Sequence, residues 1–196
     1  MNLLQKIYHI FIKQDVVTSI YTNSFGKFGN DSILYKPLCI RGKKDIFIGD
    51  NTTILNGVRI QTYNDITGLE SKVIFGDNCY IGYNNSFLAG ADIILEKGVL
   101  MASNILISSE NHSNNPEEAT YFMDQPLICS PVRIGEGTWV GERVCILPGV
   151  SIGKKCVIGA GSIVTKSVPD YSIVIGSPAK VIKHYNFRTH EWEKCN

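Results

Sequence analysis

The chain has 196 residues, which suits one domain with a real hydrophobic core. Its 19 basic and 18 acidic residues leave a net charge of +1, so no global field recruits nucleic acid or an anionic membrane. A hydrophobic fraction of 44% argues against disorder, and the longest apolar runs are too short for a membrane-spanning helix.

Residues 1–30 are predicted to form a helical N-terminal segment. Its opening lacks the uninterrupted apolar stretch and the small-residue cleavage site of a secretory signal. The apolar side chains that recur at helical spacing are Leu3, Leu4, Ile7, Tyr8 and Phe11. We expect this helix to pack on the body of the protein; the alternative is peripheral attachment to a membrane surface, such as the inner membrane.

A period of six residues dominates the rest of the chain. Glycine often follows the repeating aliphatic residue, and a small or β-branched residue stands four positions after it. The clearest run is Ile134, Val140, Ile146, Ile152, Ile158 and Val164. The same spacing occurs earlier, less cleanly, at Ile48, Ile54, Ile60, Phe75, Ile81, Phe87, Leu95, Met101 and Ile107.

A six-residue period fits neither an α-helix nor a lone strand, and it favours a parallel β-helix of short strands and turns. The aliphatic residue points inward, and glycine or asparagine eases each turn. Three hexapeptides complete one coil, so stacked positions are eighteen residues apart. Ile134, Ile152 and position 170 are therefore predicted to form one column.

Six cysteines are scattered along the chain without a CxxC pair. This pattern is neither that of a zinc site nor that of a disulfide framework. Cys79 and Cys156 occupy places where the repeat uses small residues, so we interpret them as filler in a protein of the reducing cytoplasm.

The repeat stops at residues 108–131, which are predicted to form an extruded loop. Its polar residues around Asn114 and Pro116 suit a solvent-facing turn. Tyr121, Phe122 and Met123 near the far end are too apolar for an idle loop. They are expected to form a wall against a substrate or a neighbouring subunit.

The segments IGEGTWVGERVCILPGVSIGKKCVIGAGSIVTKSVP and IGSPAKVIK resemble hexapeptide-repeat acyltransferases, in particular the galactoside and maltose O-acetyltransferases and those of polysaccharide pathways. The similarity spans about residues 46–183. It implies a mainly β fold: a left-handed parallel β-helix over residues 31–185, followed by a short helical tail over 186–196.

The resemblance also implies a reaction centre. LMASNILISSENH resembles the segment that carries the catalytic histidine, here His112, and an asparagine eight residues earlier, here Asn104. Imidazole exchanges protons readily near neutral pH, as a general base must. By spacing alone, Asn104 is equally a turn residue. The backbone amide of Glu142, which follows WVG, would stabilise the oxyanion, and Glu110 could orient the His112 ring.

The same resemblance implies acetyl-CoA as the acyl donor and a homotrimer with the coenzyme between subunits. Lys166, Lys180 and Lys183 would contact the coenzyme phosphates as point charges; the alternative is that they are ordinary surface charges. The coenzyme-binding positions would be Trp139, Gly141, Ala160, Thr165, Lys166, Lys180 and Lys183. No metal is expected, because only one histidine lies within the repeat region, whereas a zinc enzyme of the γ-carbonic anhydrase type needs several.

The sequence therefore favours an acetyl-CoA-dependent O-acetyltransferase that modifies a saccharide by direct attack. The runner-up is N-acetylation of an amino sugar, followed by acetylation of an antibiotic. A non-enzymatic scaffold is the alternative from another class.

Overall fold

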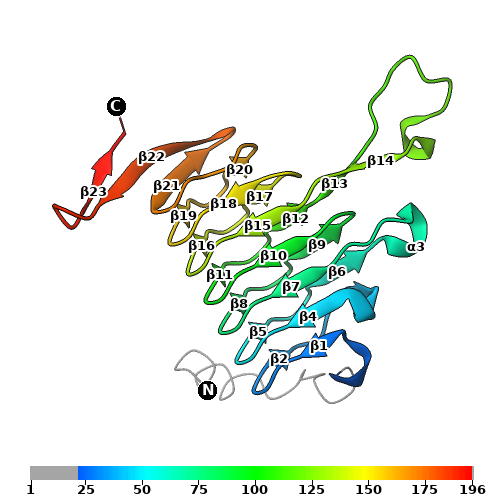
Figure 1. The fold of residues 1–196 in the computed structure, drawn as a ribbon, viewed down its shortest axis with the longest axis horizontal. Helices are drawn as coiled ribbons and strands as arrows, with labels where there is room; N and C mark the ends of the chain where they lie inside the picture. The colour runs from blue at the N-terminus through cyan, green and yellow to red at the C-terminus, as the bar shows by residue number, and fades with distance from the viewer. Residues whose placement is uncertain (1–21, 196) are drawn as a thin grey trace.

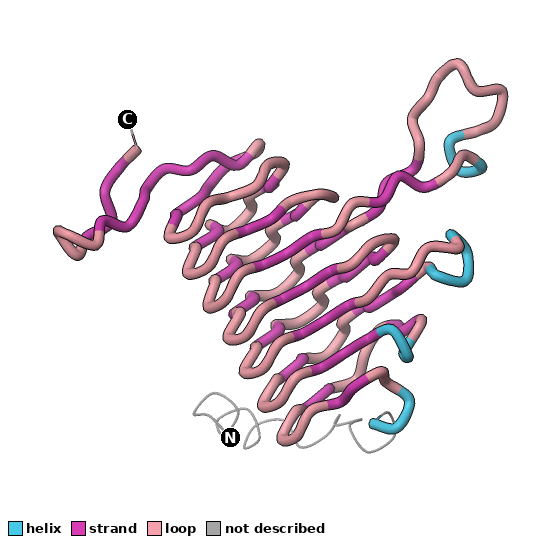
Figure 2. The backbone as a smooth tube through the Cα atoms, viewed as in Figure 1, coloured by secondary structure: helices cyan, strands magenta, loops and turns pink. Residues whose placement is uncertain are grey.

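The computed structural model describes residues 22–195, so the helix expected in the first part of the chain falls largely outside the described residues. The chain winds into a prism whose three faces are parallel sheets (Figures 1 and 2). The first face holds β1 (Lys27–Phe28), β4 (Ile46–Ile48), β7 (Val73–Phe75), β10 (Ile93–Leu95), β15 (Val132–Ile134) and β18 (Ser151–Ile152).

The other two faces repeat this arrangement. The second holds β2 (Ile33–Leu34), β5 (Thr53–Ile54), β8 (Tyr80–Ile81), β11 (Leu100–Met101), β16 (Trp139–Val140), β19 (Val157–Ile158) and β21 (Ser172–Gly176). The third holds β3 (Cys39–Arg41), β6 (Arg59–Thr62), β9 (Ser86–Ala89), β12 (Leu106–Ser108), β17 (Cys145–Ile146) and β20 (Ile163–Val164). The predicted parallel β-helix is therefore confirmed, and its first strand, β1, precedes the expected start at residue 31.

The repeating aliphatic residues fill the prism. Along the first face, the strand register stacks Ile48 on Phe75, then Leu95, Ile134 and Ile152. All six aliphatic residues of the clearest run are at most 1% exposed. Each buried side chain of this size stabilises the fold by about 1.5–3 kcal/mol, so these columns dominate its stability.

One column ends differently from the prediction. Ile152 is followed by Val168, through an isolated parallel bridge, and not by position 170. The chain returns to the first face two residues early. Asp170 instead lies at the next corner, where its carboxylate accepts a hydrogen bond from the Lys154 backbone N–H at 2.9 Å.

The corners use two devices. Residues with a positive φ make the turn, and most are glycine or asparagine, for example Asn51, Asn78 and Asn104. At the first corner, between the first and second faces, small side chains form hydrogen bonds with the backbone. The hydroxyl of Thr138, for example, donates to the Gly153 carbonyl at 2.8 Å. Cys79 belongs to this second set, as predicted, and burial raises the pKa of its thiol to about 11.

The C-terminal tail is not helical, contrary to the prediction. β22 (Ala179–Asn186) pairs antiparallel with β21, and β23 (Glu191–Lys194) pairs antiparallel with β22. This hairpin extends the second face, and β22 runs past the expected boundary at residue 185 (Figure 1). Tyr185 and Trp192 oppose each other with ring centroids 5.3 Å apart. Such cross-strand aromatic pairs favour strands over a helix.

Short helical segments interrupt the prism only at its edges. They are η1 (Thr22–Ser24), η2 (Lys43–Asp45), α3 (Asn64–Thr67) and η3 (Phe122–Asp124). Within residues 22–195, no helix is long and apolar enough to span a membrane.

Truncation of a column should be costly. Ile146→Ala removes a fully buried side chain, so we expect the free energy of unfolding to fall by about 2–5 kcal/mol. Denaturant unfolding followed by circular dichroism measures this change. Ile128→Ala, at a position 56% exposed, is the matched control and should change stability by less than about 0.5 kcal/mol. Equal losses in the two variants would contradict the role of the columns.

Candidate functional site

The chain leaves the prism where the repeat stops. Directly after β12, β13 (Glu110–His112) pairs antiparallel with β14 (Leu127–Cys129), and the residues between them form a loop that projects from the prism (Figures 1 and 2). Gln125 braces this loop, because its Nε2 donates hydrogen bonds to the carbonyls of Asn115 at 3.1 Å and Thr120 at 3.2 Å. The loop is therefore held in shape from within.

His112 and Glu110 lie two residues apart on β13, so their side chains point to the same side of the strand. Both line a pocket of about 750 Å³, and His112 is exposed. Among the described residues, the His112 ring has no hydrogen-bond partner, and Glu110 does not bond it. The orientation of the ring by Glu110 therefore remains a prediction.

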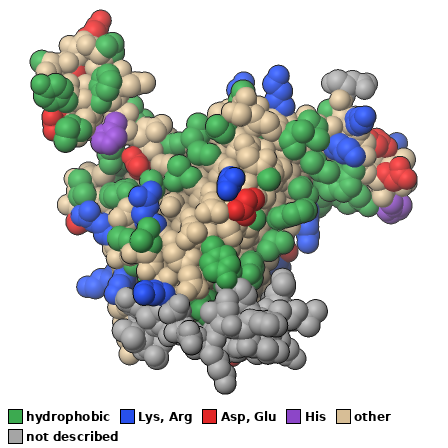
Figure 3. Space-filling view, turned by 180° about the vertical axis from the view of Figure 1, so that it is seen from behind, with side chains coloured by type: hydrophobic (Ala, Val, Ile, Leu, Met, Phe, Trp, Pro, Cys, Tyr) green, Lys and Arg blue, Asp and Glu red, His purple; other side chains and the backbone are tan. Residues whose placement is uncertain are grey.

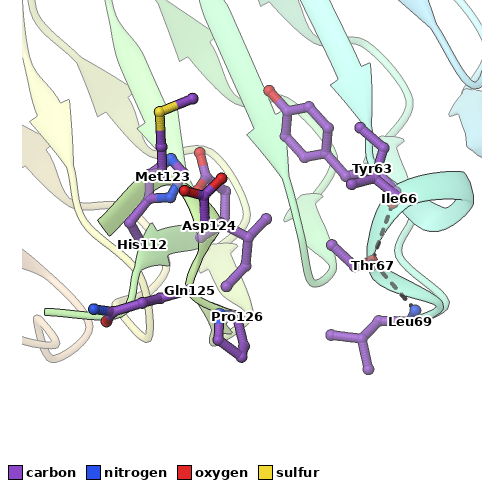
Figure 4. A pocket seen from close by; sticks show the side chains of 11 residues that line it. Tyr63, Ile66, Thr67, Leu69, His112, Met123, Asp124, Gln125 and Pro126 are labelled. Atoms are coloured by element: carbon purple, nitrogen blue, oxygen red, sulfur yellow. Dashed lines mark hydrogen bonds between the residues drawn. The ribbon is translucent and has the colours of Figure 1, made fainter. Parts of the chain in front are cut away.

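The opposite wall of this pocket comes from α3 and the residues after it, which the sequence interpretation missed. Figure 4 shows Tyr63, Ile66, Thr67 and Leu69 across the cavity from His112 and Met123. The signal was present in the spacing. Stacked first-corner residues elsewhere are 18 or 20 positions apart, as in the pairs Thr138–Cys156 and Ser32–Thr52, yet this coil needs 27.

Tyr63 gives this wall a polar edge in the pocket that His112 lines. Burial, and then the negative charge of Glu110, raise the pKa of the Tyr63 phenol. The phenol therefore stays protonated at neutral pH, and it donates a hydrogen bond to the Gln61 carbonyl oxygen Oε1 at 3.2 Å. Its own oxygen remains an acceptor at the edge of the cavity.

Asn104 lies at the corner before β12, with a left-handed φ of 60°. Its Nδ2 donates to Glu142 Oε1 at 2.7 Å, and its Oδ1 accepts from Asn84 Nδ2 at 3.5 Å. Glu142 also accepts the Ser103 backbone N–H at 3.0 Å. Asn104 is thus a turn residue, as one interpretation had it, and its side chain belongs to a corner network.

Glu142 plays a part in the structure that sequence reasoning did not foresee. The hydrogen bond from Asn104, and then that from the Ser103 backbone, lower the pKa of its carboxyl. Its own backbone N–H, the predicted oxyanion donor, has no acceptor among residues 22–195.

Several of the predicted coenzyme-binding residues cluster near this corner. Trp139 is 51% exposed on β16, and Gly141 follows it. A Cβ added at Gly141 would stand 2.7 Å from the Ala160 nitrogen, so only glycine allows these two coils to approach so closely. Lys180 stands opposite Ile175 in the β21–β22 pair, and Lys183 lies three residues further along β22, opposite Ile173.

His112 does not join this cluster within one chain. Asn104 precedes β12 and His112 follows it, so the two residues sit at opposite edges of the third face. Thr165 and Lys166 follow β20 and therefore lie at the same edge as His112, two strands away. The predicted residues thus form two separate groups on the prism.

Apolar side chains gather on the projecting loop (Figure 3). The most exposed are Tyr121 at 81% and Met123 at 75%, and Phe122 is also exposed. Met123 lines the pocket with His112, in line with the predicted wall. Among the described residues, no three histidine, cysteine, aspartate or glutamate side chains are grouped as metal ligands would be.

Known proteins are similar in sequence to this chain. A family model described as the hexapeptide repeat of succinyl-transferase matches residues 131–166. WbbJ of Escherichia coli, named as an O-acetyltransferase of lipopolysaccharide biosynthesis, is 31% identical over 174 residues, 86% of each chain. A Mycobacterium tuberculosis protein named as an acetyltransferase is 39% identical over 136 residues, 69% of this chain but only 44% of its own length.

A solved structure shares the fold as well. A hexapeptide-repeat acetyltransferase of Vibrio cholerae, in complex with acetyl-CoA, superposes with a TM-score of 0.57 at 26% identity, over 86% of this chain and 75% of its own. With the match to WbbJ over most of both chains, the class is defined by sequence and architecture together. The chain belongs to the hexapeptide-repeat acyltransferase family, as the resemblance indicated.

The corner network should respond to pH with a definite sign. Because the folded-state pKa of Glu142 is lowered, its ionised form stabilises the fold above the ordinary value of 4.5, and this contribution is lost as the pH falls through the lowered pKa. Glu142→Gln should therefore be less stable than the parent at pH 7, and the gap should close in acid. Thermal unfolding from pH 7 to pH 3 tests this; Glu117→Gln, in the exposed loop, should show no such closing gap.

Proposed function

We propose that the chain is an acetyl-CoA-dependent O-acetyltransferase that acetylates a saccharide hydroxyl, with His112 as general base. The single observation that carries the proposal is the exposed imidazole of His112 in a large pocket next to a family-typical β-helix. WbbJ, which is named for lipopolysaccharide O-acetylation, supports a saccharide acceptor.

The proposed chemistry is a direct transfer. The His112 imidazole takes the proton of the acceptor hydroxyl as its oxygen attacks the thioester carbonyl. The carbonyl oxygen becomes an oxyanion, which the Glu142 backbone N–H would stabilise. The carbon–sulfur bond then breaks, and the imidazolium returns the proton to the departing thiolate. The products are an acetyl ester and free coenzyme A.

The acyl donor is supported by the Vibrio cholerae relative, which was solved with acetyl-CoA. In this chain, the exposed Trp139 and the close approach of Gly141 to Ala160 offer a flat surface for the pantetheine arm. Asn104 retains one amide hydrogen and a lone pair with which to orient the acceptor. The cationic and hydroxyl positions for the coenzyme phosphates are Thr165, Lys166, Lys180 and Lys183.

The separation of His112 from the Trp139 group supports an active site shared by two copies. A single chain holds the base at one edge of the third face and most coenzyme positions near the other. We propose a homotrimer in which the base of one subunit meets the coenzyme surface of the next. Cyclic symmetry would then form three equivalent sites.

N-acetylation of an amino sugar is the remaining alternative, because the same base could keep an amine neutral for attack. Acetyl-CoA turnover, followed by detection of the free thiol, separates the two across matched alcohol and amine sugars. Turnover confined to the amines would reject O-acetylation.

Loss of the base should abolish most turnover. His112→Ala is expected to lower kcat by about 10²–10⁴-fold, because proton removal would fall to water. The fold should not change, since the ring makes no contact that holds the prism, and circular dichroism checks this. Ser113→Ala, next to it, is the matched control and should stay within about twofold. Unchanged transfer by His112→Ala would overturn the assignment.

A shared site predicts complementation between two inactive variants. His112→Ala removes the base, and Ala160→Tyr fills the exposed coenzyme surface. After the two proteins are unfolded, mixed in equal amounts and refolded, random assembly should make roughly a quarter of the sites intact. Activity is measured as thiol release. The absence of recovery, in trimers shown to be mixed by mass spectrometry, would place the whole site within one chain.

A further inference from the structure

The wall that α3 provides for the His112 pocket is anchored by side-chain contacts, yet two of its aliphatic side chains are exposed. Asn64 fastens its base: Oδ1 accepts from the Ser71 backbone N–H at 2.8 Å, and Nδ2 donates to the Ser71 carbonyl at 3.1 Å. Arg41 and Asp65 form an ion pair 2.6 Å long on its outer side. Ile66 is nevertheless 62% exposed and Leu69 47%. Ile66 and Leu69 line one cavity together with Met123, and apolar side chains gathered around a cavity mark a binding groove.

The facing wall has the same character. Met123 and Pro126 line the cavity from the projecting loop, which Gln125 braces from within, and Leu127 lines it from the start of β14. Figure 4 shows Met123 on the same side of the cavity as His112 and Ile66 on the far side. The aliphatic side chains therefore surround the position where an acceptor hydroxyl would meet the base.

The charges of the pocket narrow the choice of acceptor. Among the described residues that line it, Glu110 and Asp124 are the only acidic ones, and none is a lysine or arginine. A phosphorylated or carboxylated acceptor would meet two carboxylates in a confined space, which disfavours it. A neutral acceptor fits, with its hydroxyls toward Glu110 and Tyr63.

We infer that the α3 segment, residues 63–71, selects the acceptor, and that the acceptor is a neutral glycoside whose alkyl substituent packs between Ile66, Leu69 and Met123. The inference rests on the proposed function and names the substrate class for the same site. The volume of about 750 Å³ supports it, because pockets of roughly 300–1,000 Å³ hold ligands larger than a single sugar ring.

Matched glycosides test this selection. The full-length protein is assayed with acetyl-CoA and with the methyl and octyl forms of the same galactoside, glucoside and N-acetylglucosaminide, and free thiol is measured. For the sugars that are acetylated, kcat/KM should be at least tenfold higher for the octyl form. The double variant Ile66→Ser, Leu69→Ser should reduce that ratio to near one. Leu38→Ser, which is 74% exposed and lies outside the pocket lining, should keep the parental ratio.

The possible failures are distinguishable. Transfer to methyl and octyl forms at equal kcat/KM overturns the inference but leaves the proposed function standing. Transfer to none of the sugars overturns both. If the double variant dissociates the assembly in analytical ultracentrifugation while its octyl preference persists, the aliphatic tips serve a second copy of the chain, and the inference fails. A single Met123→Ser variant should lower the ratio from the opposite wall without changing α3.

Discussion

The inward stacking of one aliphatic side chain per hexapeptide is the constraint on which the whole structure depends. Each coil must return its strand to the same line, because a side chain that missed the column would leave a void at a cost of about 1 kcal/mol or more. The backbone ladder follows from this alignment. The ladder also fixes the edges of each face. His112 therefore extends from a strand pair that directly follows the paired strand β12.

The prism was predictable because its rule is local and repeated. Ile134 to Val164 define the inward columns by spacing alone, and Asn78 and Asn104 mark turns through a backbone conformation that few residues tolerate. The C-terminal hairpin was not predictable in the same way. Tyr185 and Trp192 become neighbours only after β22 has paired with the last coil, a long-range contact that short-range periodicity does not encode.

The candidate site likewise has one part that local spacing predicted and another that depends on long-range contacts. The extruded loop around His112 could be placed because the repeat visibly stops there. The long interval of 27 residues marks an insertion in this coil, but its role as a pocket wall was not predictable, since residues 63–71 have no periodicity of their own. The interaction of Asn104 with Glu142 joins residues 38 positions apart, two corners brought together by coil stacking. Spacing within a hexapeptide says nothing about such partners.

Both α3 and the loop after β12 leave the prism at the same edge and rejoin the next strand in register (Figure 2). An insertion there lengthens the chain without shifting a single stacked side chain. Substitutions and insertions at this edge can therefore change which ligand it binds, while the prism and its backbone hydrogen bonds stay the same. Such enzymes can therefore diversify by inserting new loops at this edge of an unchanged β-helix.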